Sequence, residues 1–176
     1  MKRALVLGDA ASVFEEIEAA LDLAEVDAVA ACNNMIVNWN GHLDYAVTLH
    51  PEACRDWVGI VEALRLREAA GLNRPETWAH APSAGIDRWT KHWRGSSGLH
   101  AVTALLEIGF DRIVLAGVPL SESDGHFYDR RPWHAAPSFR SGWLAHVSEI
   151  RTRVRSMSGW TAELLGRPSV EWLRSE

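Results

Sequence analysis

Two short turns in this chain carry backbone and side-chain groups suited to binding an anion. Gly95-Ser96-Ser97-Gly98 opens an expected helix over Ser97–Ile108, and Gly8-Asp9-Ala10-Ala11-Ser12 follows a short apolar run, Ala4–Leu7. The start of a helix leaves backbone N–H groups without partners and presents the positive end of the helix dipole. A phosphate or a carboxylate suits such a site. Two such turns in one small domain predict a nucleotide site, without identifying the nucleotide.

Further polar residues follow other expected strands. Asn33-Asn34 comes after a strand over 27–32, and His50 and Gly117 stand near the ends of strands over 43–49 and 112–118. Asparagine amides hold donors and an acceptor that can read a base or a sugar hydroxyl, although asparagine is also a common turn former. The predicted nucleotide contacts are Gly8, Asp9, Ser12, Asn33, Asn34, His50, Ser96, Ser97, Gly98 and Gly117.

Two histidines are candidates for acid–base chemistry. His134 and, as the alternate, His126 lie in a long polar loop over 120–138. An imidazole titrates near neutrality and can take a proton from an attacking hydroxyl, yet a loop histidine can equally be a bystander. The eight histidines form no His-Glu-x-x-His pattern and no close Cys/His pair, so we expect no metal site.

The elements that must position these residues alternate between strands and helices. Apolar runs such as Ala4–Leu7 are typical of strands buried on both faces, and helical spacing follows Ser12, where Glu15 would complete a capping box. The alternation predicts an α/β fold: a single Rossmann-like, nucleotide-binding domain over 1–176, with a mainly parallel sheet and helices on both faces. Ligands of such sheets bind beyond the carboxyl ends of the strands, where all the predicted contacts would converge.

Composition limits the classes of partner. The chain has 176 residues and a net charge of −5, which argues against duplex nucleic acid as the main partner. No apolar run approaches the ~20 residues of a membrane span and no signal-peptide core is visible, so we expect a cytoplasmic protein. The sequence leaves a homo-oligomer open. Nine tryptophans are unusual, and they fit either an aromatic ligand wall or ordinary packing.

Two common nucleotide motifs are missing. The turn at Gly8 lacks the glycine spacing of the dinucleotide fingerprint, and no Gly-Lys-Ser/Thr phosphate loop occurs. Hydride transfer with a nicotinamide cofactor and P-loop phosphoryl transfer are therefore both disfavoured.

The order of motifs resembles the Rossmann-like superfamily of the bacterial lipooligosaccharide sialyltransferases and the 6-hydroxymethylpterin diphosphokinase-like proteins. The sialyltransferases open with Gly-Asn-Gly-Pro-Ser-Leu and continue with Cys-Asn-Gln, Asn-Pro, Thr-Ser-Gly, Leu-Gly-Tyr and Ser-Gly-Ile-Asp. The resemblance extends over about two thirds of the chain through short matching segments. They are Gly8–Val13, Cys32-Asn33-Asn34, His50-Pro51, Ser96-Ser97-Gly98, Ile108-Gly109-Phe110 and Ala116–Pro119.

This resemblance implies a pocket for a nucleotide or a nucleotide-sugar and a catalytic histidine in the loop after the long strand. The chain departs from the family at three positions. Asp9 replaces a neutral amide, Pro119 replaces an acid, and His50 replaces an Asn or, in the pterin-kinase-like branch, an Asp. Loss of that Asp weakens the case for magnesium, since hard cations require oxygen ligands.

We therefore expect a small glycosyltransferase-like transferase that uses a nucleotide-sugar donor and a small-molecule or glycan acceptor. His134 or His126 would deprotonate the acceptor hydroxyl. One alternative is a magnesium-dependent pyrophosphokinase of a pterin-like alcohol. The other is a non-catalytic module that binds a nucleotide or a protein.

Overall fold

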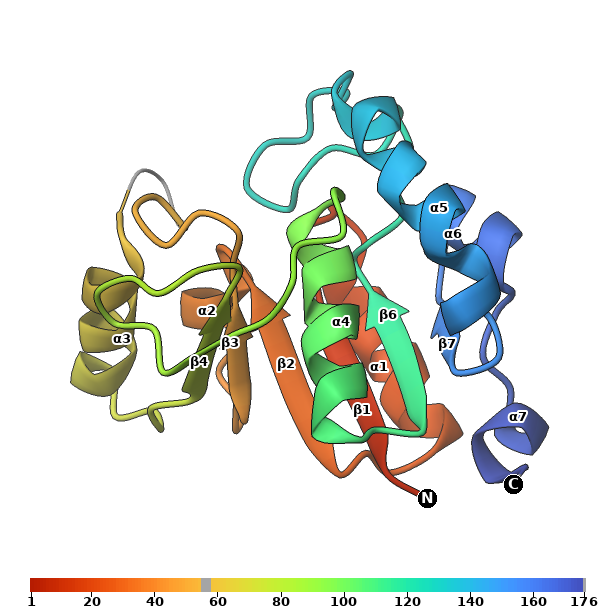
Figure 1. The fold of residues 1–176 in the computed structure, drawn as a ribbon, viewed down its shortest axis with the longest axis horizontal. Coiled ribbons are helices and arrows are strands. Elements are labelled where there is room, and N and C mark those ends of the chain that lie inside the picture. The colour runs from red at the N-terminus through yellow and green to blue at the C-terminus, as the bar shows by residue number, and fades with distance from the viewer. Residues whose placement is uncertain (55–57, 176) are drawn as a thin grey trace.

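Seven parallel strands form one sheet in the computed structural model, which describes residues 1–54 and 58–175. The strand order is β5-β4-β3-β2-β1-β6-β7, so the chain builds outward from β1 in one direction and then returns to build in the other. This arrangement confirms the predicted α/β Rossmann-like class (Figure 1). The strands are β1 (Arg3–Leu7), β2 (Ala28–Cys32), β3 (Tyr45–Val47), β4 (Glu76–Ala79), β5 (Arg88–Trp89), β6 (Arg112–Ala116) and β7 (Val154–Ser156).

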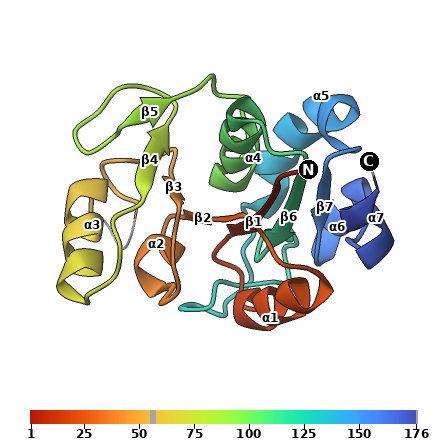
Figure 2. The same ribbon diagram turned by 90° about the horizontal axis from the view of Figure 1, so that it is seen from below.

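The central strands are buried because helices cover both faces of the sheet. Figure 2 shows α4 and α5 on one face and α1, α2 and α3 on the other. Ala4–Leu7 of β1 is inaccessible to solvent, as expected for an apolar run between two layers. No helix in the described part of the chain is both long and apolar enough to cross a membrane. The helices are α1 (Val13–Leu23), α2 (Met35–Asn38), α3 (Ile60–Ala69), α4 (Ser97–Ile108), α5 (Arg140–Ile150), α6 (Gly159–Leu165) and α7 (Val170–Arg174), with a 3₁₀ turn, η1 (Ala136–Phe139), before α5.

Helix α4 has the predicted bounds, and Gly109 ends it in the left-handed conformation, at φ 97°. The third strand is shorter than expected, since β3 spans only Tyr45–Val47. The capping box at the start of α1 is wrong: Ser12 makes no capping hydrogen bond, and its hydroxyl donates instead to Glu16.

A buried arginine fixes the short helix α2, which the sequence did not predict. Arg67 of α3 has no solvent exposure, and burial lowers the pKa of its guanidinium. The guanidinium satisfies carbonyls within and just after α2, so it holds α2 and the turn that follows it in place. Its acceptors are the carbonyl oxygens of Ile36, Trp39, Gly41 and Asn73 and the side-chain oxygen of Asn73.

Candidate functional site

The carboxyl ends of β1 and β6 meet where the strand order reverses, which is where open α/β sheets bind ligands. A cavity of about 110 Å³ lies there, and we call it the switch-point cavity. The start of α4 and the segment between β6 and α5 lie beyond these strand ends (Figure 1). The lining residues are Gly8, Asp9, Ala10, Cys32, Asn33, Ser96, Ser97, Gly98, Gly117, Val118, Pro119, Leu120, Asp124, Gly125, His126 and Trp133.

The floor of the cavity is a close approach of two glycines. A Cβ on Gly8 would lie 2.3 Å from the Gly117 carbonyl oxygen, and a Cβ on Gly117 would lie 2.6 Å from the Gly8 oxygen. Gly117 also has φ 71°, which side chains rarely adopt. Glycine is required at both positions because the backbones leave no room for a side chain.

Glu16 is hydrogen-bonded to this floor at Gly117. Its buried carboxylate accepts a hydrogen bond from the Gly117 N–H at 2.7 Å and from the hydroxyls of Ser12 and Ser158. Sequence reasoning missed this role because it gave the polar contact to Glu15. The helical period alone places Glu16 on the same face as the apolar residues Val13 and Ala20.

Asp9 lines the cavity, yet its charge is directed toward α2. One carboxylate oxygen accepts from the Met35 N–H at 3.2 Å, and the other accepts from the Asn34 side-chain amide at 3.2 Å. A carboxylate at the start of a helix is favoured by the helix dipole. A negative charge beside a phosphate site repels the anion, and these contacts reduce that repulsion. Asn34 donates a hydrogen bond to Asp9 and is not among the residues that line the cavity.

Asn33 lines the cavity, and only part of its side-chain amide is hydrogen-bonded. Its side-chain oxygen accepts from the Thr48 hydroxyl at 3.0 Å and from the Ser97 hydroxyl at 3.3 Å. Each hydroxyl already accepts a backbone N–H, from His50 and Leu49 respectively, so its proton is directed to Asn33. The Asn33 NH₂ has no acceptor within the described part of the chain and can donate to a ligand.

The first turn of α4 forms another wall. Within residues 1–54 and 58–175, no acceptor meets the N–H groups of Ser97, Gly98 and Leu99. The Ser96 hydroxyl accepts from the Trp143 indole at 3.3 Å and does not cap these groups. A Cβ on Gly98 would lie 2.7 Å from Val118, so glycine allows the turn to pack against the end of β6.

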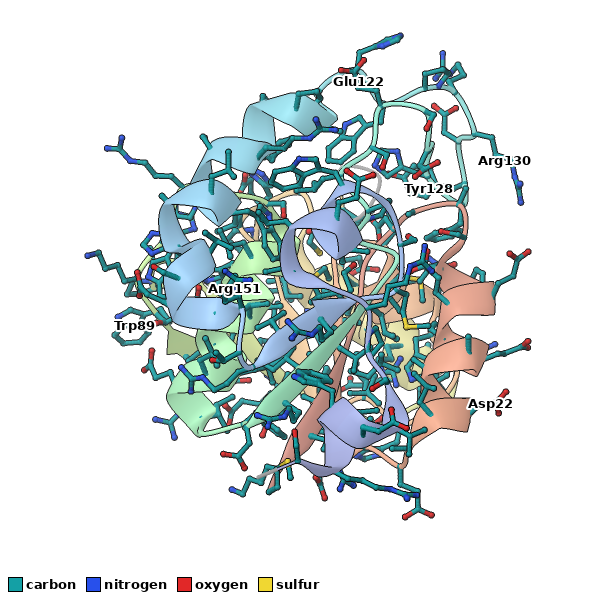
Figure 3. The ribbon with its side chains drawn as sticks, turned by 90° about the vertical axis from the view of Figure 1, so that its right-hand side faces the viewer. Asp22, Trp89, Glu122, Tyr128, Arg130 and Arg151 are labelled. Atoms are coloured by element: carbon teal, nitrogen blue, oxygen red, sulfur yellow. The ribbon has the colours of Figure 1, made fainter. Side chains whose placement is uncertain are left out.

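The segment 120–135 covers the cavity and is hydrogen-bonded to the turn after β1. Ala11 N–H donates to the Gly125 carbonyl at 2.9 Å, Phe127 N–H donates to the Asp9 carbonyl at 2.9 Å, and Ala10 forms an antiparallel bridge with His126. These backbone contacts place the His126 ring at the cavity. Figure 3 shows Arg130 of the same segment pointing outward.

His126 stands among aromatic rings. Its ring stacks on Tyr128 at 5.1 Å between centroids and meets the edge of Trp133 at 5.2 Å. Burial lowers the pKa of His126, and the charge of Asp129 opposes part of that shift. The imidazole is therefore neutral at pH 7 and able to accept a proton. Burial, followed by the charge of Asp9, raises the pKa of the Cys32 thiol, which is thereby kept protonated.

His134 does not line the switch-point cavity. It is exposed and lines a neighbouring hollow of about 480 Å³, here called the outer hollow, whose other lining residues include His126 and Trp133. His50 lines a different hollow, and Ser12 faces Glu16. The structure thus brings His126, rather than His134, to the predicted phosphate-binding turns.

The sequence analysis did not select Asp124, Pro119 or Leu120 as site residues, although all three line the cavity. Their position directly after β6 was the available signal, since the carboxyl ends of parallel strands carry the site. Both readings of the tryptophans have an example: Trp143 is fully buried, whereas Trp133 lines the cavity.

No family model matches the chain, and no curated protein or solved structure matches it either. The likeness to the sialyltransferase superfamily therefore stays a prediction that rests on the order of short motifs.

Proposed function

We propose that the switch-point cavity binds the phosphate of a nucleotide or nucleotide-sugar and that the protein is a small glycosyltransferase-like enzyme. The observation that carries the proposal is the convergence of three groups on one cavity. These are the unpartnered N–H groups at Ser97 and Gly98, the Asn33 NH₂, and the neutral imidazole of His126. The first two can hold an anion, and the third can accept a proton.

In this proposal the oxygen of the acceptor hydroxyl attacks the anomeric carbon of the donor sugar. The bond between that carbon and the phosphate oxygen breaks, and the nucleotide leaves with the bonding electrons. His126 takes the hydroxyl proton, and the start of α4 stabilises the charge that develops on the leaving phosphate. The cavity volume of about 110 Å³ is below the ~300–1,000 Å³ of most small-molecule sites, so we assign only the phosphate end of the donor to it.

A second candidate is the magnesium-dependent pyrophosphokinase. It is favoured by one observation, that the carboxylates of Asp9 and Asp124 both line the cavity. Oxygen ligands of this type bind magnesium together with substrate phosphates. Asp9 already accepts hydrogen bonds from Asn34 and Met35, and in the described residues no group of three or more His, Cys, Asp or Glu is arranged to hold a metal ion.

A thermal-shift screen separates these functions. The screen uses nucleoside mono-, di- and triphosphates and nucleotide-sugars, each with magnesium and with EDTA. A ligand at a hundredfold excess over Kd stabilises the folded state by ~2.7 kcal/mol. Stabilisation that survives EDTA supports the transferase and indicates its donor. Stabilisation by ATP only with magnesium supports the kinase, and no stabilisation by any nucleotide refutes both.

The role of His126 is tested with the donor found in that screen. His126→Gln should lower turnover by ~10²-fold or more without weakening donor binding, because the amide cannot take the proton. Turnover of the wild type should fall as the pH decreases through an apparent pKa below the ordinary imidazole value of ~6.5. His134→Gln serves as the comparison. A loss confined to His134→Gln would move the catalytic assignment to that residue.

A further inference from the structure

The hollow that His50 lines adjoins the switch-point cavity on the side of β3 and β4. Its volume is about 720 Å³, which is within the usual range of small-molecule sites, ~300–1,000 Å³. We call it the histidine groove because three imidazoles line it. The lining residues are Asn33, Leu49, His50, Glu52, His80, His92, Gly95, Ser96, Ser97, Trp133 and Phe139.

The imidazoles come from three separate places in the chain. His50 follows β3, His80 follows β4, and His92 follows β5. The rings of His80 and His92 are 5.7 Å apart, and a His50 ring nitrogen lies 3.6 Å from a Glu52 carboxylate oxygen. Only the parallel topology brings these residues together, since all three follow the carboxyl ends of neighbouring strands.

The chemistry of the groove suits a neutral, hydroxylated ligand. Imidazoles and the Glu52 carboxylate offer both donors and acceptors to hydroxyl groups. Trp133 stacks on Phe139, with 5.3 Å between ring centroids, and supplies an aromatic wall. No lysine or arginine is among the described residues that line the groove, so it lacks the fixed positive charge that a phosphorylated ligand requires.

The groove opens onto the reacting end of the proposed donor site. Ser96, Ser97 and Trp133 line both hollows, so a ligand in the groove borders the phosphate-binding turn of α4. His126 lines the switch-point cavity from the opposite segment. A hydroxyl that enters the cavity from the groove would therefore meet both the anion site and the proposed base.

We propose that the histidine groove binds the acceptor and that this acceptor is a neutral saccharide, an inference that rests on the proposed transferase function. Trp133 then acts as a positioning residue between acceptor and donor. The outer hollow, which also borders His126 and Trp133, is left for the remainder of the nucleotide.

The test uses ¹H–¹⁵N NMR of the tryptophan indole groups at pH 8, with and without a saturating nucleotide from the thermal-shift screen. The probes are methyl α-glucoside, lactose, N-acetylglucosamine and, as the charged comparison, glucose 6-phosphate. The groove variant is the double substitution His80→Ala and His92→Ala, both at exposed side chains. His42→Ala is the matched control, since His42 is also exposed but precedes β3 at the opposite end of the sheet.

We expect at least one neutral saccharide to shift the Trp133 indole signal in the wild type and in His42→Ala. The double variant should bind that saccharide at least tenfold more weakly, whereas its affinity for the nucleotide should be unchanged. The acceptor role is overturned if no neutral saccharide binds, if glucose 6-phosphate binds more tightly, or if the double variant retains saccharide affinity. It is also overturned if saccharide and nucleotide compete, because the groove would then hold the nucleoside. Failure of every nucleotide to bind the wild type instead refutes the proposed function itself.

Discussion

Gly117 and Gly71, two of the glycines with positive φ, allow the rigidity of the cavity floor to be measured. They have nearly equal backbone angles, φ 71° and φ 76°. Alanine in this conformation costs about 1 kcal/mol at either position. At Gly71 an added Cβ meets nothing within 4 Å, whereas at Gly117 it lies 2.6 Å from the Gly8 oxygen and 2.7 Å from Val13. Such overpacking adds ~1–3 kcal/mol.

We therefore expect Gly117→Ala to lower the free energy of unfolding by about 3 kcal/mol and Gly71→Ala to lower it by about 1 kcal/mol. Urea unfolding followed by circular dichroism gives both values, with the wild type as reference. For a chain of this size, 1 kcal/mol corresponds to ~2–4 °C in Tm, so the expected losses are about 9 °C and about 3 °C.

The same two variants test whether the structure of the cavity floor affects ligand binding. Gly117→Ala should also weaken binding of the nucleotide found by thermal shift, because the shifted backbone changes the position of the cavity wall. Gly71→Ala should bind it like the wild type, since Gly71 follows α3, away from the cavity lining. Equal stability losses in the two variants would refute the reasoning: the ends of β1 and β6 would then yield to a methyl group at no cost.

Two further predictions concern stability. Arg67→Met should lower the free energy of unfolding by about 3 kcal/mol, measured by urea unfolding, because it leaves buried carbonyls at the end of α2 without donors; a loss below about 1 kcal/mol would contradict this role. His100 is buried in α4, and burial lowers its pKa to about 4, with His92 and His80 adding to the shift. Between pH 6.5 and about 4 the unfolded chain binds a proton that the folded His100 does not, so stability should fall by about 3 kcal/mol as the pH decreases through this window. His100→Leu should lose that part of the pH dependence, and an unchanged slope would exclude His100 as its source.

The sequence predicted the sheet well because its strongest signals are local. The apolar run Ala4–Leu7 and the regular spacing over Ser97–Ile108 can each form only one kind of element that buries its apolar side chains. The short helix α2 was not predicted because the contacts that stabilise it are long-range. Helix α2 has four residues and depends on Arg67, which is 28 to 31 residues away in sequence from the carbonyls it holds at Trp39 and Ile36. No local pattern contains such a contact.

The same difference between local and long-range signals applies to the site. Parallel strands bring their carboxyl ends to one edge, so the sequence could group Gly8, Asn33 and Gly117 before any coordinates were known. The direction of each side chain depends on a particular long-range hydrogen bond. Asn34 follows Asn33 in the same turn but contacts Asp9, and no sequence pattern separates the two amides.

The order of motifs could not predict which of the two loop histidines lines the switch-point cavity. The resemblance placed a histidine after β6 and favoured His134, but a loop residue is positioned by whatever its backbone pairs with. Here the hydrogen bonds from Ala11 to the Gly125 carbonyl and from Phe127 to the Asp9 carbonyl join the loop to the turn after β1. These contacts lie on either side of His126 and leave His134 exposed. The turn after β1 therefore both lines the proposed anion site and positions the proposed base, so changes to its backbone should alter donor binding and proton transfer together.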